Sequence, residues 1–422
     1  MDATNKLARF ATDTRYEDLP DSVRHAAKRI ILDTIGCVFG AVGTTPGLAV
    51  RQVVKMQGGD GATVLGTGQR AGVMTAAYAN GRLANLLDFD ECYMVQGHHA
   101  QSTLGAALAL CEEAGKSGKD LIAAFAVGFE TGIRFGGFLS PRVSVGDDGK
   151  AVGWTGLAGP GQGVYAACAA TSNLWGLPPD QVSQAFGLCA QYMVGRDWNR
   201  QWGTDVELGT IKYADTGWNA QAGMMAALAA REEVTGIKHI FDRESFAQVF
   251  KGVILKPEAL TEKLGERWFV QNTSIKFWPC CRWIHYALTG FAELIQEHRL
   301  SAEEIQSVEL CSFPVIPNPS FTNQQPVNLV AAGMSFPHAA AMVALDVPAG
   351  PEWFAPAQMT GERAKAFRNK VEFEIDPAGY DPNAWGLGEG VLKVPSFARI
   401  KARGAEFRRA SLFALGDPWD GA

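Results

Sequence analysis

The sequence has 422 residues, of which 47% are hydrophobic and 19% are charged, and its formal net charge at pH 7 is −6. This composition is typical of a globular protein and too apolar for a disordered chain. At about 150 residues per domain, the length predicts two or three domains, each able to bury a core. No basic stripe is present, which excludes nucleic acid as an expected partner, and an anionic ligand would need a local cationic pocket.

The cysteines and the N-terminus indicate a reducing compartment. The chain has 8 cysteines, but no CxxC motif and no Cys/His spacing that fits zinc or an iron–sulfur cluster. Residues 1–20 are charged throughout and lack the apolar core of a signal peptide. The longest apolar runs, such as Leu121–Val127, are far shorter than the ~18–20 residues of a membrane span. We therefore expect a cytoplasmic protein with no metal and no membrane partner.

The chain up to residue 267 is predicted to form one large all-helical domain. From Ser22 onward, apolar residues recur at three- and four-residue spacing, and Asp21 or Ser22 can cap the first helix. Later segments are rich in Ala and Gly, whose small side chains allow helices to pack closely. The expected helices cover residues 22–42, 73–87, 102–114, 119–136, 165–174, 179–193 and 218–233.

From residue 268 the pattern changes to strands interspersed with helices, which predicts a smaller α/β domain over residues 268–402. We expect residues 403–422 to return to the helical domain. Alternation of polar and apolar residues predicts half-exposed strands, and Pro/Gly-rich stretches predict loops. The expected strands cover residues 305–312, 370–375 and 397–402, the helices 282–298 and 334–345, and the loops 313–326 and 377–389.

The densest polar cluster consists of Asp88, Asp90 and Glu91, followed by His98 and His99. One interpretation is an active-site loop in which carboxylates orient imidazoles that transfer protons. A second is a divalent metal site, because a D-x-D motif with histidine can bind such an ion. A third is a solvated loop whose carboxylates cap the next helix.

Two further segments carry cations. Lys212 precedes the helix expected from residue 218, and a lysine beside free helix N–H groups can bind a carboxylate or phosphate, although a surface lysine fits equally. The segment KFWPCCRWIH, residues 276–285, places aromatic rings around a Pro-Cys-Cys turn. There, Arg282 can hold a carboxylate through two parallel hydrogen bonds, and His285 shares its helical face. A domain-linking turn with a buried histidine is the alternative.

Glycine-rich stretches at residues 66–72 and 159–163 do not match G-x-G-x-x-G, and no P-loop lysine follows either one. We therefore expect no nucleotide cofactor. The polar and aromatic segment 196–202 fits either a pocket lining or a surface loop.

Taken together, these segments resemble the MmgE/PrpD family, which includes 2-methylcitrate dehydratase, cis-aconitate decarboxylase and iminodisuccinate epimerase. The resemblance covers nearly the whole chain. It rests on five blocks in the right order: residues 18–42, the DFDE…HH block with the two helices after it, K-x-x-x-x-G-x-x-A at 212–220, KFWPCCRWIH, and SFPHAAAMVAL. The resemblance implies a larger all-helical domain joined to a smaller α/β domain, an active site between them, a homodimer and no cofactor.

Residue by residue, the resemblance assigns site positions. Asp88 matches the first aspartate of the family's active-site loop, and His98 matches the histidine of its His-Pro pair, with His99 replacing the proline. Lys212 matches the active-site lysine, and His285 matches the histidine of PCCR-x-x-H.

Three positions depart from the family pattern. Cys92 falls where the decarboxylases have threonine, and Asp215 where a histidine is frequent. The family often has a histidine in a GFHPT-like segment, whereas this chain reads Gly153-Trp154-Thr155-Gly156. The chain also ends at GDPWDGA, where relatives usually continue into another helix.

We predict a cofactor-independent lyase, of dehydratase or decarboxylase type, that transfers a proton next to a carboxylate of a small di- or tricarboxylate. His98, oriented by Asp88, is the expected base, and His285 is the second acid/base group. Lys212 and Arg282 are expected to hold substrate carboxylates. Cys92, His99 and Trp154 complete the expected substrate-binding set. The alternatives are a two-base epimerase, a metal-dependent hydrolase or lyase, and a non-catalytic acid-binding protein on the same fold.

Overall fold

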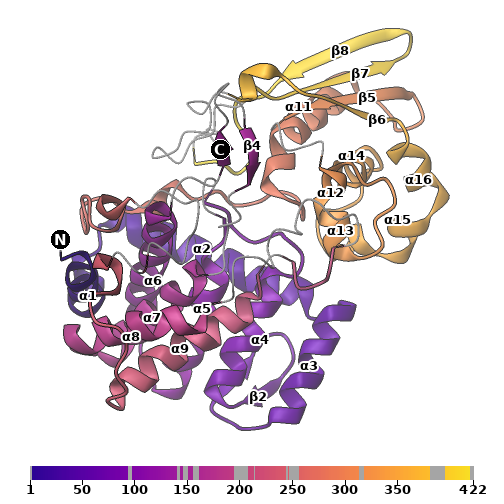
Figure 1. The fold of residues 1–422 in the computed structure, drawn as a ribbon. Helices are drawn as coiled ribbons and strands as arrows, with labels where there is room; N and C mark the ends of the chain where they lie inside the picture. The colour runs from indigo at the N-terminus through magenta and orange to yellow at the C-terminus, as the bar shows by residue number, and fades with distance from the viewer. Residues whose placement is uncertain are drawn as a thin grey trace.

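The computed structural model describes most of the chain as two bodies (Figure 1). One consists of helices from the first half of the chain, and the other of strands and shorter helices from the second half. The predicted fold class, mainly α with a smaller α/β domain, is confirmed. The described residues are 2–93, 97–139, 143–145, 151–154, 161–193, 208–212, 214–243, 246, 256–312, 318–380 and 395–418, with the backbone alone at 143–145, 151–154, 377 and 380.

The large domain is a layered bundle of helices with two short β-ribbons. The ribbons pair β1 (Ala62–Val64) with β2 (Gln69–Ala71) and β3 (Val143–Val145) with β4 (Ala151–Trp154). The helices are α1 (Ala3–Asp13), α2 (Asp21–Ala41), α3 (Thr45–Gln57), α4 (Val73–Asn85), α5 (Ala100–Glu113), α6 (Gly118–Phe138), α7 (Gln162–Trp175), α8 (Pro179–Tyr192) and α9 (Thr216–Arg231). The sequence patterns did not predict α1, α3 or either ribbon.

Side-chain caps define where several helices begin. Ser117 and Asp120 form a reciprocal capping box at the start of α6. The carboxylate of Asp215 accepts hydrogen bonds from the backbone N–H groups of Gly217 and Trp218 and so begins α9. The expected cap of α2 by Asp21 or Ser22 is wrong, because α2 already begins at Asp21 and its N-cap residue is Pro20.

Small residues allow the central helices to pack with their backbones close together, as the Ala/Gly content predicted. A Cβ atom at Gly105 of α5 would lie 2.7 Å from the carbonyl oxygen of Ala77 in α4. A Cβ atom at Gly128 of α6 would lie 2.6 Å from the carbonyl oxygen of Ala166 in α7. Larger side chains at these two glycines would separate the helices that carry the candidate site.

Helix α6 is long and apolar enough to cross a membrane by length and composition, which corrects the expectation from short apolar runs. However, 83% of the apolar window is buried inside the protein. The helix also contains Glu130 and Arg134, both buried, whose Nε–Oε1 distance is 2.8 Å. Arg134 donates further hydrogen bonds to carbonyl groups of residues 259–267. These features are typical of a core helix that anchors the segment linking the two domains.

The smaller domain is built on a sheet with strand order β6–β5–β7–β8. The β5–β6 pair is parallel and the other pairs are antiparallel. Helix α11 packs against β7 and β8, and its side chains form one core with those of β5 and β7. The elements are α11 (Arg282–His298), β5 (Ile305–Cys311), α12 (Pro319–Thr322), α13 (Leu329–Met334), α14 (Phe336–Ala344), α15 (Pro356–Thr360), α16 (Glu362–Arg368), β6 (Val371–Glu374), β7 (Phe397–Ala402) and β8 (Ala405–Ala410).

The C-terminal segment differs from the expectation that residues 403–422 return to the helical domain. Residues 405–410 form β8, the edge strand beside β7, because Gly404 supplies the positive φ that a tight hairpin requires. Beyond β8, Ala414 does pack in a hydrophobic cluster with helical-domain residues. The segment therefore belongs first to the small sheet and then to the boundary between the domains.

Backbone and side-chain contacts hold the two domains together at one boundary. Cys92 and Ser274 exchange two backbone hydrogen bonds of 3.0 and 3.1 Å. The N–H of Ile275 donates to the carbonyl of Gly416, in the segment that follows β8. This boundary places the loop after α4, the loop before α9 and the segment before α11 next to one another.

Candidate active site

Asp88 is the centre of the candidate site. It follows the C-terminal end of α4, and only 3% of its surface is exposed. Its φ of 53° lies in the left-handed region, which residues other than glycine rarely adopt. Lys212, which contacts it, has a φ of 60°. Strained backbone at two residues that touch each other is typical of functional sites.

Two lysines converge on one oxygen of Asp88. The Nζ atom of Lys212 lies 2.6 Å from Oδ1 and donates to the carbonyl of Asn85. The Nζ atom of Lys276 lies 3.1 Å from the same oxygen and 2.6 Å from the backbone carbonyl of Asp88. Oδ2 of Asp88 is buried and has no hydrogen-bond partner among the described residues. One carboxylate thus organises cations from both domains.

These contacts determine the charges at the centre. Burial alone would raise the pKa of Asp88, but Lys212 and Lys276 outweigh it, so the pKa of Asp88 is lowered and the carboxylate is ionised. Burial alone would lower the pKa of Lys276, but the Asp88 and Asp90 carboxylates outweigh it and raise that pKa. Lys276 is therefore an ammonium ion and a hydrogen-bond donor.

His98 lies between two aspartates. Its Nδ1 atom is 2.9 Å from Oδ2 of Asp90, and its Nε2 atom is 3.6 Å from Oδ1 of Asp88. The closer contact shows that Asp90 orients the imidazole, whereas the sequence led us to expect Asp88 in that role. Burial opposes ionisation of Asp90, but His98 outweighs it and lowers the pKa of Asp90.

Two of the predicted substrate-binding residues are buried beside this centre. Cys92 is fixed by its backbone bridge to Ser274, and burial raises the pKa of its thiol to about 12, so it is a neutral thiol. His99 is fully buried, with its ring edge-on to Phe129 at a centroid distance of 5.7 Å. The side chain of Trp154, the third of this set, lies outside the described residues.

Arg282 lies near this centre but is already paired. Its Nη2 atom forms an ion pair with Asp417, and both side chains are buried. Nη1 donates to the carbonyl of Leu415 at 2.9 Å, and Nη2 also reaches the carbonyl of Ala414. To hold a substrate carboxylate through both Nη groups, Arg282 would have to release these contacts with the C-terminal segment, whereas its Nε is buried without a partner among the described residues.

His285 is a fully buried imidazole on α11. Its Nε2 atom is 3.3 Å from the carbonyl of Cys280, and its Nδ1 atom is 3.4 Å from Nη1 of Arg282. Burial, reinforced by Arg282 and Lys276, holds the pKa of His285 well below its usual range. His285 is therefore neutral, and its ring nitrogens face α11 and the turn before it rather than Asp88.

Lys276 and Asp90 are the residues that sequence reasoning missed. Lys276 begins the segment KFWPCCRWIH, yet Arg282 was chosen as its cation because arginine binds carboxylates in a bidentate way. Asp90 is a candidate metal ligand or helix cap in the sequence, but Asp88 was the expected partner of His98. The D-x-D spacing was the available signal, because it placed a second carboxylate within reach of His98.

A metal ion fits this cluster poorly. Single ligand atoms of Asp88, Asp90 and His98 lie within 4.8 Å of one another, which is compatible with a cation. However, the ammonium groups of Lys212 and Lys276 already contact Oδ1 of Asp88. A divalent cation close to that oxygen would be repelled by both lysines.

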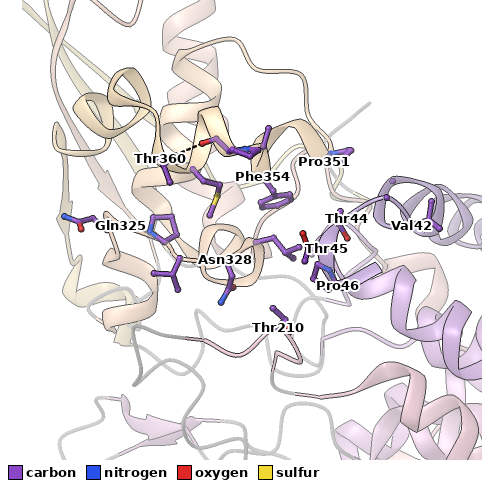
Figure 2. Close-up of a pocket in the computed structure, with 18 of the residues that line it drawn as sticks. Val42, Thr44, Thr45, Pro46, Thr210, Gln325, Asn328, Pro351, Phe354 and Thr360 are labelled. Atoms are coloured by element: carbon purple, nitrogen blue, oxygen red, sulfur yellow. Dashed lines mark hydrogen bonds between the residues drawn. The ribbon is translucent and has the colours of Figure 1, made fainter. Parts of the chain in front are cut away.

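A pocket of about 1210 Å³ opens along the same domain boundary (Figure 2). One wall is the corner between α2 and α3, and the other is formed by residues 325–329 and by α15 and its neighbours. Thr210, part of its lining, lies two residues before Lys212, and its carbonyl accepts a hydrogen bond from Arg82. The pocket therefore adjoins the loop that carries Lys212.

The fold and the site together define a class: a helical domain and a smaller α/β domain whose boundary buries lysines, aspartates and a histidine around one centre. The chain belongs to the MmgE/PrpD family. The model of the MmgE/PrpD N-terminal domain matches residues 5–257, and that of the C-terminal domain matches residues 278–386.

Several relatives are similar over most of this chain. It is 30% identical to the cis-aconitate decarboxylase-like protein oryM of Aspergillus oryzae over 72% of this chain and 64% of that protein. It is 27% identical to cis-aconitate decarboxylase of Aspergillus terreus over 81% of this chain and 72% of that protein. It is 26% identical to human cis-aconitate decarboxylase over 89% of this chain and 77% of that protein. The chain thus spans just under two thirds of the length of oryM.

Proposed function

We propose that this protein is a lyase, with decarboxylation as the expected reaction, acting on a small di- or tricarboxylate by proton transfer next to a carboxylate. The observation that carries this proposal is the convergence of Lys212, Lys276 and His98 on the buried carboxylate of Asp88. The names of the relatives support decarboxylation over dehydration.

The charge balance of the centre favours an anionic substrate that binds together with a proton. The carboxylates of Asp88 and Asp90 are balanced by the ammonium groups of Lys212 and Lys276. A further carboxylate in this buried place is costly unless a positive charge accompanies it. His98 supplies that charge when it is protonated. It can then donate its proton to the substrate carbon.

Lys276 can serve the substrate without leaving Asp88. An ammonium group has three N–H donors, and those of Lys276 reach Oδ1 and the backbone carbonyl of Asp88. Its third donor can hold the substrate carboxylate while negative charge develops on the neighbouring carbon. Asp88 therefore anchors the cations, and His98 moves the proton.

An epimerase is the second candidate, because the sequence has no histidine at residues 153–156, where other members often carry one. Epimerisation returns the proton to the opposite face of the same carbon and needs no leaving group. The homodimer and the cytoplasmic location remain predictions, which mass measurement in solution and cell fractionation would test.

The experiment is an NMR assay of unsaturated and hydroxylated di- and tricarboxylates in D₂O, in the presence of a chelator. We expect release of CO₂ with deuterium at the carbon that loses it. Deuterium entering an otherwise unchanged acid would indicate the epimerase. No change in any acid would overturn the lyase proposal, and activity lost with the chelator and restored by a metal ion would overturn the metal-free site.

The variant His98→Asn identifies the proton carrier. We expect its turnover to fall by about 10²–10⁴-fold, the range for loss of a general acid or base. His25→Asn is the matched control, because His25 is exposed on α2. Turnover of His98→Asn close to that of the control would remove His98 from the mechanism.

A further inference from the structure

Gln101 joins two buried carboxyl groups behind His98. Its Nε2 atom donates one hydrogen bond to Oε2 of Glu91 at 2.7 Å and another to Oδ2 of Asp90. Gln101, Asp90 and Glu91 are all 0% exposed. An amide nitrogen has two hydrogens, and both are used here. Oε1 of Gln101 is buried without a partner among the described residues, so the two N–H donors hold the amide in place.

Asp90 links Gln101 to His98. Its Oδ2 atom accepts a hydrogen bond from Nδ2 of Asn85 at 2.8 Å and lies 2.9 Å from Nδ1 of His98. Gln101 is the second hydrogen-bond donor to this oxygen, and the imidazole lies against it as a third neighbour. A carboxylate held in this way favours the imidazole tautomer with its proton on Nδ1. Nε2, the nitrogen that faces Asp88, can then carry the transferred proton.

Glu91 fixes the other end of Gln101. Its Oε1 atom accepts hydrogen bonds from the backbone N–H groups of His99 at 2.8 Å and Ala100 at 3.0 Å, where α5 begins. Burial, together with the Asp90 carboxylate, raises the pKa of Glu91 well above its usual range. Burial and Asp90 thus favour the protonated form of Glu91, whereas the two backbone N–H donors oppose it.

We propose that Gln101 is a positioning residue, whose amide ties Asp90 to the start of α5 and so holds the proton of His98 on Nδ1 and directs Nε2 toward Asp88. The orientation of His98 is a property of the chain itself. Its consequence for catalysis rests on the proposed function.

The other charged groups around Asp90 also influence the titration of His98, and they are unchanged in the variants used below. Asp33 faces the cluster from α2, Lys212 from the loop before α9 and Lys276 from the segment before α11. The titratable groups that act on Asp90 or its partners are Asp33, Asp88, Glu91, His98, Lys212 and Lys276.

The test is NMR of ¹⁵N-histidine-labelled full-length protein with a chelator present, with His98→Asn used to assign the His98 signals. We expect the wild-type shifts to show the Nδ1–H tautomer. In Gln101→Leu, Asp90 loses one donor, so its charge favours the imidazolium more strongly. The titration midpoint of His98 should rise by about half a pH unit or more.

Thr103→Val is the matched control. Thr103 is buried on the same helix and donates to the carbonyl of His99, but it does not contact Asp90. We expect this variant to keep the wild-type tautomer and midpoint even if it is less stable. If Gln101→Leu folds and its His98 signals match those of the control, the proposal is overturned.

Kinetics add a second readout. Gln101→Leu should lower kcat and move the alkaline limb of the kcat/KM profile, where His98 loses its proton, in the same direction as the NMR midpoint. KM should change little, because Gln101 lies behind the imidazole. If the wild type turns over no carboxylic acid, the proposed function fails, whereas the NMR comparison still decides the role of Gln101.

Discussion

Two buried clusters at the domain boundary each pair a carboxylate with cations, but they are built differently. Around Asp417, one oxygen takes Arg282 and the hydroxyl of Ser274, and the other takes the N–H of Ala414. Around Asp88, two lysines share one oxygen, while the other has no hydrogen-bond partner among the described residues. The backbone at Asp88 is also in the left-handed region.

This difference indicates that the Asp417 cluster stabilises the structure, whereas the Asp88 cluster can bind a ligand. A buried carboxylate whose oxygens are both satisfied gains nothing from a ligand, and breaking it leaves an unpaired charge. A carboxylate that shares one oxygen between two cations and leaves the other unused can exchange contacts with a substrate, and backbone in the left-handed region is typical of functional sites. We therefore assign Arg282 to stability and Lys276 to function.

The largest effect is expected from Arg282→Met, which leaves Asp417 charged and unpaired in the interior. The free energy of unfolding should fall by about 3–5 kcal/mol, measured by urea denaturation. The activity of the folded fraction should stay within a few-fold of wild type. A variant that is as stable as wild type but has a greatly raised KM would show instead that Arg282 holds the substrate, as predicted from the sequence.

Lys276→Met tests the other cluster. Removing one of the donors at the developing charge should lower kcat/KM on the order of 10²–10³-fold. The control is Lys370→Met, because Lys370 also donates to carbonyl groups, those of Ala302 and Ile305, but within the small domain. If both variants retain kcat/KM within a few-fold of wild type, Lys276 has no role in catalysis, and the proposed difference between the two clusters is wrong.

Asp33→Asn is expected to have the smallest effect, and it depends on pH. Burial, followed by the charge of Asp90, raises the pKa of Asp33 from 3.8 to about 7. Because the folded state holds this proton more tightly, the stability of the wild type decreases as the pH rises from about 4 to about 7 and then levels off. The amide of Asp33→Asn does not ionise, so the variant does not lose this stability.

The free energy of unfolding of Asp33→Asn should therefore exceed that of wild type by an amount that grows with pH. The difference should reach about 2 kcal/mol at alkaline pH, after allowance for partial exposure of the side chain. Urea unfolding of both proteins at about pH 5, 7 and 9 measures it. A difference in stability that does not change with pH would show that Asp33 does not titrate in this range.

Much of the fold follows from local patterns. The helix expected over residues 282–298 is observed as α11 with the same bounds, and the strand expected over 397–402 is observed as β7. Strong periodicity with clear end signals made these elements predictable. The strand β8 was missed, because its burial pattern alternates only weakly and its pairing with β7 depends on a hairpin at Gly404.

The candidate site was predictable only in part. Sequence patterns placed Asp88, His98 and Lys212 together, and the structure confirms that they meet. The same patterns predicted Arg282 as the cation that holds the substrate carboxylate and Asp88 as the residue that orients His98. In the structure, Lys276 and Asp90 have these positions. Those choices depend on which cation is already neutralised and which oxygen faces the imidazole, and neither appears in a linear motif.

The amino-acid sequence by itself determined the helical and α/β halves, the family and the loop with its carboxylates and histidines, because these depend on local periodicity and on short motifs. Only the tertiary structure decided which charged side chains form ion pairs with one another. Lys276 and Asp88 are 188 residues apart. Only burial at the domain boundary, where water no longer screens them, makes one a partner of the other and leaves Arg282 to the C-terminal segment.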